Sequence, residues 1–301
     1  MEQHSWNLAS CNLCPRDCKA NRLAGETGIC GASGTLTVAR AALHHWEEPC
    51  ISGTRGSGTV FFSGCGLRCT FCQNAPISLG LYGKEIDVQR LCEIFFELRD
   101  QGAHNINLVT PTPYLPLIAE AIHFSKSQGF SLPFVANFGG YENVEVWKQM
   151  DGLIDIYLPD LKFCDSRVAR KYARAPEYFE RATEVIEEMF RQVGPPVLDA
   201  DGIMNRGVIV RHLMIPGELF DTRRILSYIL ATYGNSVFIS LMNQYTPPNP
   251  PRKNAPARPL SYRHYEAMID FLVENGQTNA FTQDMGTDEE SFIPPFDRTG
   301  V

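Results

Sequence analysis

The sequence predicts an α/β protein that is built around a parallel sheet and preceded by an irregular, cysteine-rich segment. Three observations support this fold class. From Thr59 onward, short apolar runs alternate with segments of helical periodicity. Eight of the ten cysteines lie within the first 75 residues. Hydrophobic residues make up 44% of the 301-residue chain, so it can bury a sizeable core.

Six strand–helix units are expected after residue 58, and their strands should be parallel because βαβ units have parallel strands. Buried apolar runs predict strands at Thr59–Phe62, Asn105–Val109, Pro133–Asn137, Leu153–Leu158, Val208–Ile215 and Val237–Met242, with a further short run at Asn279–Thr282. Apolar stripes and capping residues predict helices at Asp87–Gln101, Leu115–Gln128, Val144–Met150, Ser166–Gln192 (broken near Pro176), Thr222–Tyr233 and Tyr262–Glu274. The pattern alone does not decide between a doubly wound open sheet and a partial barrel. In both, reactive residues lie at the carboxyl ends of the strands.

Composition divides the chain into a cysteine-rich, metal-binding segment (1–58) and a core domain (59–301). The net charge of −7 argues against a nucleic-acid partner.

No apolar stretch approaches the roughly 20 residues that span a bilayer. Met1–Trp6 lacks the basic and then apolar pattern of a secretory signal, so a cytoplasmic protein is expected. Thiols stay reduced there, and metal binding is the usual role of so many cysteines.

The central motif is C-x3-C-x2-C, formed by Cys65, Cys69 and Cys72 directly after the first predicted strand. A four-iron cluster normally takes four thiolates, so three leave one iron open. An open coordination position is typical of a catalytic metal. Phe71 can shield one side of such a cluster from water. A zinc site or buried structural thiols are the alternatives, although no fourth zinc ligand lies in the immediate sequence.

This motif, with an aromatic residue before its last cysteine, resembles that of the radical S-adenosylmethionine (SAM) superfamily. The stretch Gly64–Asn74 is similar to pyruvate formate-lyase-activating enzymes. Glu47–Asn74 and the N-terminal cysteines are similar to a subgroup called pyruvate formate-lyase-activating enzyme-like. The resemblance runs from about Cys11 to Tyr245. It implies a partial (β/α)6 TIM-type barrel, a [4Fe-4S] cluster on the three central cysteines, and SAM bound at the open iron.

The resemblance also implies anaerobic radical chemistry. An electron from a reduced flavodoxin or ferredoxin would break the sulfonium C–S bond of SAM, and the resulting 5′-deoxyadenosyl radical would abstract hydrogen from the substrate. A protein or peptide is the expected substrate. If the resemblance to the activating enzymes extends to the substrate, that substrate is a glycyl radical enzyme. The alternatives are modification of a small molecule or RNA, a non-catalytic iron–sulfur electron-transfer protein, and a structural zinc protein.

Candidate SAM contacts stand at the ends of the second, third and fourth predicted strands. Where related enzymes carry a Gly-Gly-Glu-type motif that receives the amino group, this chain has Thr110 and Thr112. These threonines are polar substitutes for that motif or, alternatively, caps of the next helix. Asn137 resembles a family Asn at the third strand end. Asp160 and Lys162 match a family Asp-x-Lys motif that helps to hold the cofactor carboxylate.

Arg211 lies inside the apolar run of the fifth predicted strand. A buried arginine needs an anionic partner, and the cofactor carboxylate is a suitable one. His212 should point the other way, because side chains alternate along a strand, and a structural role is expected for it. The residues 243–245 that end the sixth strand are candidates to face the substrate.

A second candidate metal site is formed by four cysteines within twenty residues, Cys11, Cys14, Cys18 and Cys30. The segment has few apolar residues, so a metal would supply folding energy that a core cannot. Zinc and a second iron–sulfur cluster both suit four thiolates, and free thiols are the alternative.

The remaining three cysteines stand apart. Cys92 is expected in the core, because it lies among apolar residues of a predicted helix. Cys50 and Cys164 are candidate hydrogen-atom donors near the active site.

Overall fold

The framework of the computed structural model is one sheet, described over residues 6–80, 82–284 and 294–301. The predictions for 1–58 and 59–301 therefore include some positions outside the described residues, among them Met1–Ser5. Within the described part, the ten strands pair in the order β10-β9-β8-β6-β5-β4-β2-β1-β3, and β7 pairs with β8 off this path. The strands are β1 (Leu36–His44), β2 (Ser57–Phe62), β3 (Lys84–Ile86), β4 (Ile106–Val109), β5 (Phe134–Phe138), β6 (Ile156–Pro159), β7 (Val197–Leu198), β8 (Met204–Leu213), β9 (Phe238–Met242) and β10 (Ala280–Thr282).

The predicted α/β class is confirmed. All pairs from β2 through β4, β5, β6, β8 and β9 to β10 are parallel, whereas β1 pairs antiparallel with β2 and with β3. The edge strands β3 and β10 do not pair with each other in the described residues, which is the arrangement of a partial TIM-type barrel.

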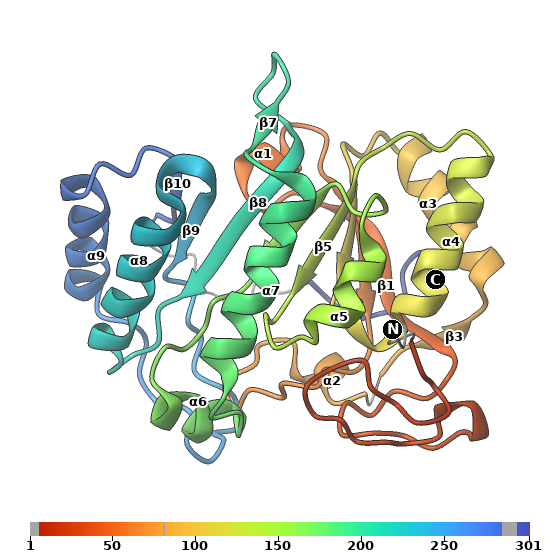
Figure 1. The fold of residues 1–301 in the computed structure, drawn as a ribbon, viewed down its shortest axis with the longest axis horizontal. Coiled ribbons are helices and arrows are strands. Elements are labelled where there is room, and N and C mark those ends of the chain that lie inside the picture. Colours follow the sequence, from red (N-terminus) through yellow and green to blue (C-terminus); the bar gives the residue numbers. More distant parts are fainter. Residues whose placement is uncertain (1–5, 81, 285–293) are drawn as a thin grey trace.

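The helices follow the strands as the βαβ pattern predicts, and Figure 1 shows α4, α5, α7 and α8 in front of the sheet. The helices are α1 (Pro49–Ser52), α2 (Ala75–Ser78), α3 (Val88–Asp100), α4 (Leu115–Ser127), α5 (Val144–Trp147), α6 (Ser166–Ala173), α7 (Tyr178–Val193), α8 (Leu219–Tyr233) and α9 (Tyr262–Glu274). The break predicted near Pro176 separates α6 from α7, where Arg174 has a left-handed backbone. In the described part of the chain, no helix is both long enough and apolar enough to cross a membrane.

The expectation that residues 1–58 are irregular is wrong for β1. This strand lies within the segment and pairs with β2 over most of its length. The sequence conceals it because three alanines and an arginine interrupt the apolar alternation, and alanine is a weak strand former. The segment before β1 is irregular apart from a short 3₁₀ turn at Arg22–Ala24, and in Figure 1 it lies beside α2.

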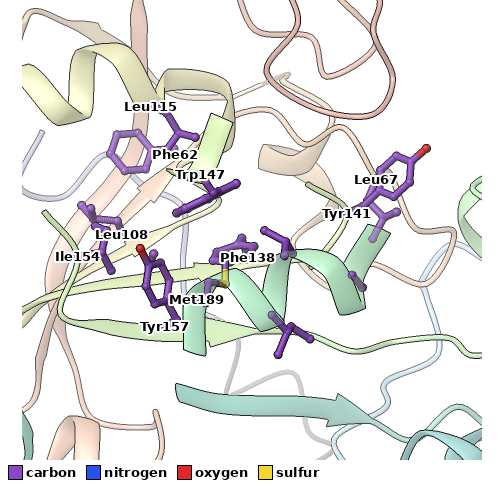
Figure 2. Packing of buried hydrophobic residues seen from close by; sticks show 14 of the residues in the cluster. Phe62, Leu67, Leu108, Leu115, Phe138, Tyr141, Trp147, Ile154, Tyr157 and Met189 are labelled. Carbon is purple, nitrogen blue, oxygen red and sulfur yellow. The ribbon is translucent and has the colours of Figure 1, made fainter. Parts of the chain in front are cut away.

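The core that supports the site is aromatic. Trp147 is fully buried and stacks on Phe138, with 4.5 Å between the ring centroids, and Tyr157 meets it edge-on (Figure 2). The indole Nε1 donates a hydrogen bond to Glu142 Oε2 at 3.1 Å. This packing fixes the end of β5, from which Asn137 projects.

Replacing Trp147 with alanine should destabilise the fold by about 3–5 kcal/mol, because it leaves a large cavity beneath β5. Unfolding midpoints of anaerobically prepared protein measure the effect. The control is Phe220→Ala, because this side chain is 82% exposed and its loss should change stability by less than about 0.5 kcal/mol. Equal midpoints for the two variants would contradict this account of the core.

Candidate active site and cysteine clusters

The three central cysteines lie on the loop between β2 and α2, at the carboxyl edge of the sheet. The loop is held by its backbone: Gly64 N donates to Ile77 O at 2.7 Å, and Thr70 N donates to Tyr172 O at 2.8 Å. Phe71 packs edge-on against Phe163 and Tyr172. The predicted shielding residue is therefore anchored in an aromatic cluster beside the thiols.

Cys65, Cys69 and Cys72 are free thiols that line one cavity of about 260 Å³. Burial raises the pKa of Cys65 to about 11 and also raises the pKa of Cys69. These thiols ionise only when a cation compensates them, as metal binding does. Three soft sulfur donors on one loop fit an iron–sulfur cluster with an open position.

The same cavity receives the predicted residues of β5 and β6. Asn137 and the Asp160–Lys162 pair line it. Lys162 Nζ lies 2.5 Å from Asp160 Oδ2, and both side chains are 16% exposed. The hydroxyl of Tyr178 accepts a hydrogen bond from Lys162 N at 2.9 Å and lies within donating distance of Asp160 O. The turn after β6 is thereby fixed with its ammonium group facing the cavity.

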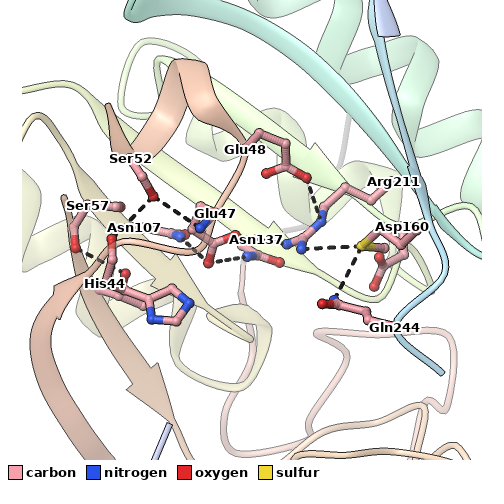
Figure 3. A network of polar contacts seen from close by, with 12 residues as sticks. His44, Glu47, Glu48, Ser52, Ser57, Asn107, Asn137, Asp160, Arg211 and Gln244 are labelled. Atoms are coloured by element: carbon pink, nitrogen blue, oxygen red, sulfur yellow. Dashed lines mark hydrogen bonds and ion pairs between the residues drawn. The ribbon is translucent and has the colours of Figure 1, made fainter. Parts of the chain in front are cut away.

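Arg211 also lines the cavity, but its anionic partners come from the chain itself. Its Nη1 lies 3.2 Å from Glu47 Oε2, and its Nε lies 3.1 Å from Glu48 Oε1 (Figure 3). Glu47 Oε1 also accepts a hydrogen bond from Asn107 Nδ2 at 3.0 Å. The requirement for an anion was predicted correctly, and two carboxylates from the loop after β1 meet it. Contact of Arg211 with a cofactor carboxylate stays a prediction.

Glu47 and Glu48 were not singled out by the sequence reasoning. Glu47 faces the cavity, and Glu48 Oε2 is buried without a hydrogen-bond partner. Burial raises the pKa of Glu47 to about 7, although Arg211 acts in the opposite direction. The available signal was two adjacent acids at the end of a strand, but it could not be used because β1 itself was missed.

The two threonines after β4 differ in the cavities that they line, since Thr110 lines both the main cavity and a second one, whereas Thr112 lines only the second. Thr110 has a left-handed backbone, with a φ of 58°, and lines the main cavity. Thr112 lines a second, smaller cavity instead, and the main cavity does not include it. Neither the 3₁₀ turn Thr112–Tyr114 nor α4 has a side-chain cap, so the alternative capping role is not observed.

The expected orientation of His212 is observed. Its ring nitrogens lie 2.7 Å from Leu161 O and 3.0 Å from Thr222 Oγ1, away from the cavity. Burial lowers its pKa to about 4, so the ring is neutral. Of the residues after β9, Gln244 and Tyr245 line the cavity and Asn243 does not.

The single cysteines lie outside the main cavity. Cys92 is in the core, as predicted, and its thiol donates to Ala121 O. Cys50 is buried in α1 against β5 and β6. Cys164 lines a surface hollow with Phe179 and Phe220. Neither Cys50 nor Cys164 lines the main cavity, so the structure gives no support to a hydrogen-atom donor role for either.

The N-terminal cysteines are brought together. All four line the second cavity, of about 30 Å³, which also touches Cys65. In the described part of the chain, no three His, Cys, Asp or Glu side chains converge closely enough to hold a single metal ion. The four thiols lie around the walls of the cavity.

Comparison with known proteins now identifies the class. The model of the radical SAM superfamily matches residues 59–229, more than half of the chain, and the chain belongs to this superfamily. Membership implies an enzyme with a [4Fe-4S] cluster and SAM, and the residues described above fit both. The pyruvate formate-lyase-activating enzyme-like subgroup stays a prediction.

Similar proteins include the uncharacterized protein MJ0674 of Methanocaldococcus jannaschii, which is 29% identical over 248 residues, or 79% of this chain and 66% of that protein. Among solved structures, Streptococcus suis SuiB bound to its precursor peptide SuiA has a TM-score of 0.52 at 13% identity, and SuiB bound to S-adenosylmethionine has 0.50 at 14%. Both matches cover 74% of this chain and 47% and 49% of the SuiB chains, respectively. At these identities the likeness to SuiB concerns the fold alone. The chain spans just under two thirds of MJ0674 and about half of SuiB.

Replacing Glu47 with glutamine should change how stability depends on pH. The folded protein holds a proton on Glu47 up to a pKa of about 7, against 4.5 for an ordinary glutamate, so this group makes unfolding easier as the pH rises through that interval. Glu47→Gln removes this contribution. We expect the wild type to lose more stability than the variant between these pH values, as measured by unfolding midpoints. Parallel pH profiles would show that Glu47 titrates as it does in the unfolded chain.

Proposed function

We propose that this protein is a radical SAM enzyme that reductively cleaves S-adenosylmethionine and abstracts hydrogen from a protein or peptide substrate. One observation carries the proposal: the cysteines of the β2–α2 loop, the Asp160–Lys162 pair and Arg211, which come from three parts of the sheet, line one cavity. A [4Fe-4S] cluster would be held by Cys65, Cys69 and Cys72. When bound, it supplies the electron that breaks the sulfonium C–S bond of SAM.

The residues around the cavity have separate tasks in this proposal. The ammonium group of Lys162 attracts the SAM carboxylate, and Asp160 orients Lys162. Arg211 offers the carboxylate a hydrogen bond, since Glu47 and Glu48 already compensate its charge. Thr110 and Asn137 offer polar contacts to the rest of the amino-acid part. Thr112 was the sixth candidate contact, and its place in the second cavity speaks against this role. Phe71 and its aromatic neighbours keep water from the thiol loop.

A protein or peptide substrate is supported by two points. The fold is similar to that of SuiB, which has been crystallised with a precursor peptide. The cavity wall includes Trp46, which is 68% exposed and offers an aromatic surface to an incoming chain. A glycyl radical enzyme is the narrower proposal, because of the sequence resemblance to activating enzymes. A reduced flavodoxin or ferredoxin in an anaerobic cytoplasm would be the electron donor.

We also propose that residues 1–58 form a metal-binding segment joined to the radical SAM core of residues 59–301. Zinc and a second iron–sulfur cluster are the two metals that suit its four thiolates.

Changing Cys65, Cys69 and Cys72 together to alanine should remove about four irons, since one cubane cluster is lost. The variant should form no 5′-deoxyadenosine from SAM under dithionite, whereas the wild type should. Iron analysis and chromatography of the nucleoside products measure the two effects. Equal iron content in the wild type and the triple variant would contradict the proposed role of this loop as the cluster site.

Replacing Lys162 with methionine should weaken SAM binding about 10- to 100-fold, the effect of losing one charge-assisted hydrogen bond. Equilibrium binding of SAM to the cluster-loaded protein measures it. Lys171→Met is the matched control, because Lys171 pairs with Glu218 outside the cavity. The same affinity in both variants would contradict the assignment of Lys162.

The substrate class can be tested by deuterium transfer. An extract of deuterated cells is separated into macromolecules and small molecules, and each fraction is incubated with reduced protein and unlabelled SAM. We expect deuterium in 5′-deoxyadenosine only with macromolecules, and protease treatment should abolish it. Transfer from the small-molecule fraction, or transfer that resists protease and is lost with ribonuclease, would overturn the peptide proposal. A non-catalytic electron-transfer protein would form no 5′-deoxyadenosine at all.

A further inference from the structure

The four N-terminal thiols surround a cavity whose walls are shaped by particular residues of the chain. Cys11 and Cys30 are buried, and Cys14 and Cys18 are partly exposed. Gly28 leaves the space that one sulfur needs, since a Cβ there would lie 2.5 Å from Cys18 Sγ. Any larger residue at this position would displace the thiol.

Two arginines, the buried Arg22 and the half-buried Arg16, hold this segment and give it positive charge. Arg22 is 2% exposed and donates to Ser33 O at 3.0 Å and to Pro113 O at 2.6 Å. Arg16 donates to Gly66 O at 2.9 Å and to Ala173 O at 2.7 Å. Both arginines line the cavity, where their positive charges can compensate the negative charge of a thiolate-bound cluster.

The cavity also contains an unsatisfied polar atom. Thr112 Oγ1 is buried and makes no hydrogen bond of acceptable geometry, although it lies close to the buried carboxyl group of Glu142. A buried hydroxyl without a partner is costly. Hydroxyl groups donate hydrogen bonds to the sulfur atoms of iron–sulfur clusters, and such bonds tune the reduction potential.

The wall of this cavity is shared with the central loop. Cys65, Leu67 and Gly139 line both cavities. A Cβ at Gly66 would lie only 3.1 Å from Cys14 Sγ, so the backbone of the central loop is almost in contact with an N-terminal thiol. On the outer side, Ile29 lines the cavity and is 45% exposed, which brings the site near the surface.

We propose that Cys11, Cys14, Cys18 and Cys30 hold a second iron–sulfur cluster that relays electrons to the central one across the Cys14–Gly66 contact. This inference rests on the proposed function, since the central cluster is the acceptor. A reduced flavodoxin or ferredoxin is oxidised by one electron and reduces the second cluster. The second cluster is reoxidised when it passes that electron to the central cluster, where SAM takes it up. Zinc is redox-inactive and could not act in this way.

Metal content tests the site. Iron, sulfide and zinc are measured in anaerobically purified wild type, in Cys14→Ala/Cys18→Ala, and in the Cys65/Cys69/Cys72→Ala variant. We expect the double variant to lose about two or four irons, according to the cluster type, and the central variant to keep those irons with an iron–sulfur electron paramagnetic resonance signal. The control Cys164→Ala should match the wild type. Zinc or no metal at the N-terminal cysteines would overturn the proposal.

Gly28→Ala keeps every thiol and tests the same site if the double variant does not fold. Its methyl group should displace Cys18 and lower the iron content in the same way, whereas full iron content would contradict the assignment of Cys18.

The relay is tested by comparing two reductants. SAM cleavage is measured with dithionite, which can reduce the central cluster directly, and with reduced flavodoxin. In the double variant, the ratio of the flavodoxin rate to the dithionite rate should fall by an order of magnitude. An unchanged ratio would overturn the relay. If the wild type binds the second cluster but cleaves no SAM with either reductant, the proposed function fails while the second cluster stands.

Discussion

The buried guanidinium of Arg211 is the constraint on which the site depends. It lies on β8, in the middle of the parallel sheet, and its charge is compensated by Glu47 and Glu48 from the loop after β1. A buried charge that loses its partner is costly, so this loop must lie across the interior of the partial barrel. The same loop provides one wall of the cavity, with Glu47 bonded to Asn107 of β4. One network of ion pairs and hydrogen bonds therefore links the loop after β1 with β4 and β8, and Glu47 and Arg211 of this network line the cavity.

The carboxyl edge of the sheet organises the rest. Parallel strands end at the same edge, and each loop that leaves it contributes one kind of group: thiols after β2, Thr110 after β4, Asn137 at the end of β5, and the Asp160–Lys162 pair after β6. The cysteine-rich segment packs on this edge and adds four thiols behind the central loop. The sulfur-rich part of the molecule is thus continuous from near the surface to the main cavity.

The regular βα units could be predicted from the sequence because periodicity reports burial directly. The helix at Val88–Asp100 and the paired helices α6 and α7 lie where apolar stripes and a proline break predicted them. β1 was not predicted, because the residues Ala39, Arg40, Ala41 and Ala42 show no clear alternation of apolar and polar side chains. Its strand conformation depends on pairing with β2, which is a tertiary effect. The donor role considered for Cys50 and Cys164 finds no support in the structure, because closeness in sequence to a site does not place a thiol in its cavity.

The sequence by itself determined the chemistry. The C-x3-C-x2-C spacing, the Asp-x-Lys pair and the arginine within a strand are local patterns, and each requires a particular kind of partner. Only the tertiary structure decided which partners meet. In the folded protein, Arg211 pairs with two glutamates, Thr112 lines the second cavity and not the main one, and the four N-terminal thiols lie against the central loop. The physical reason is that an ion pair, or a cavity lined by several segments, depends on the distances between residues far apart in the chain. A local sequence pattern does not contain these distances.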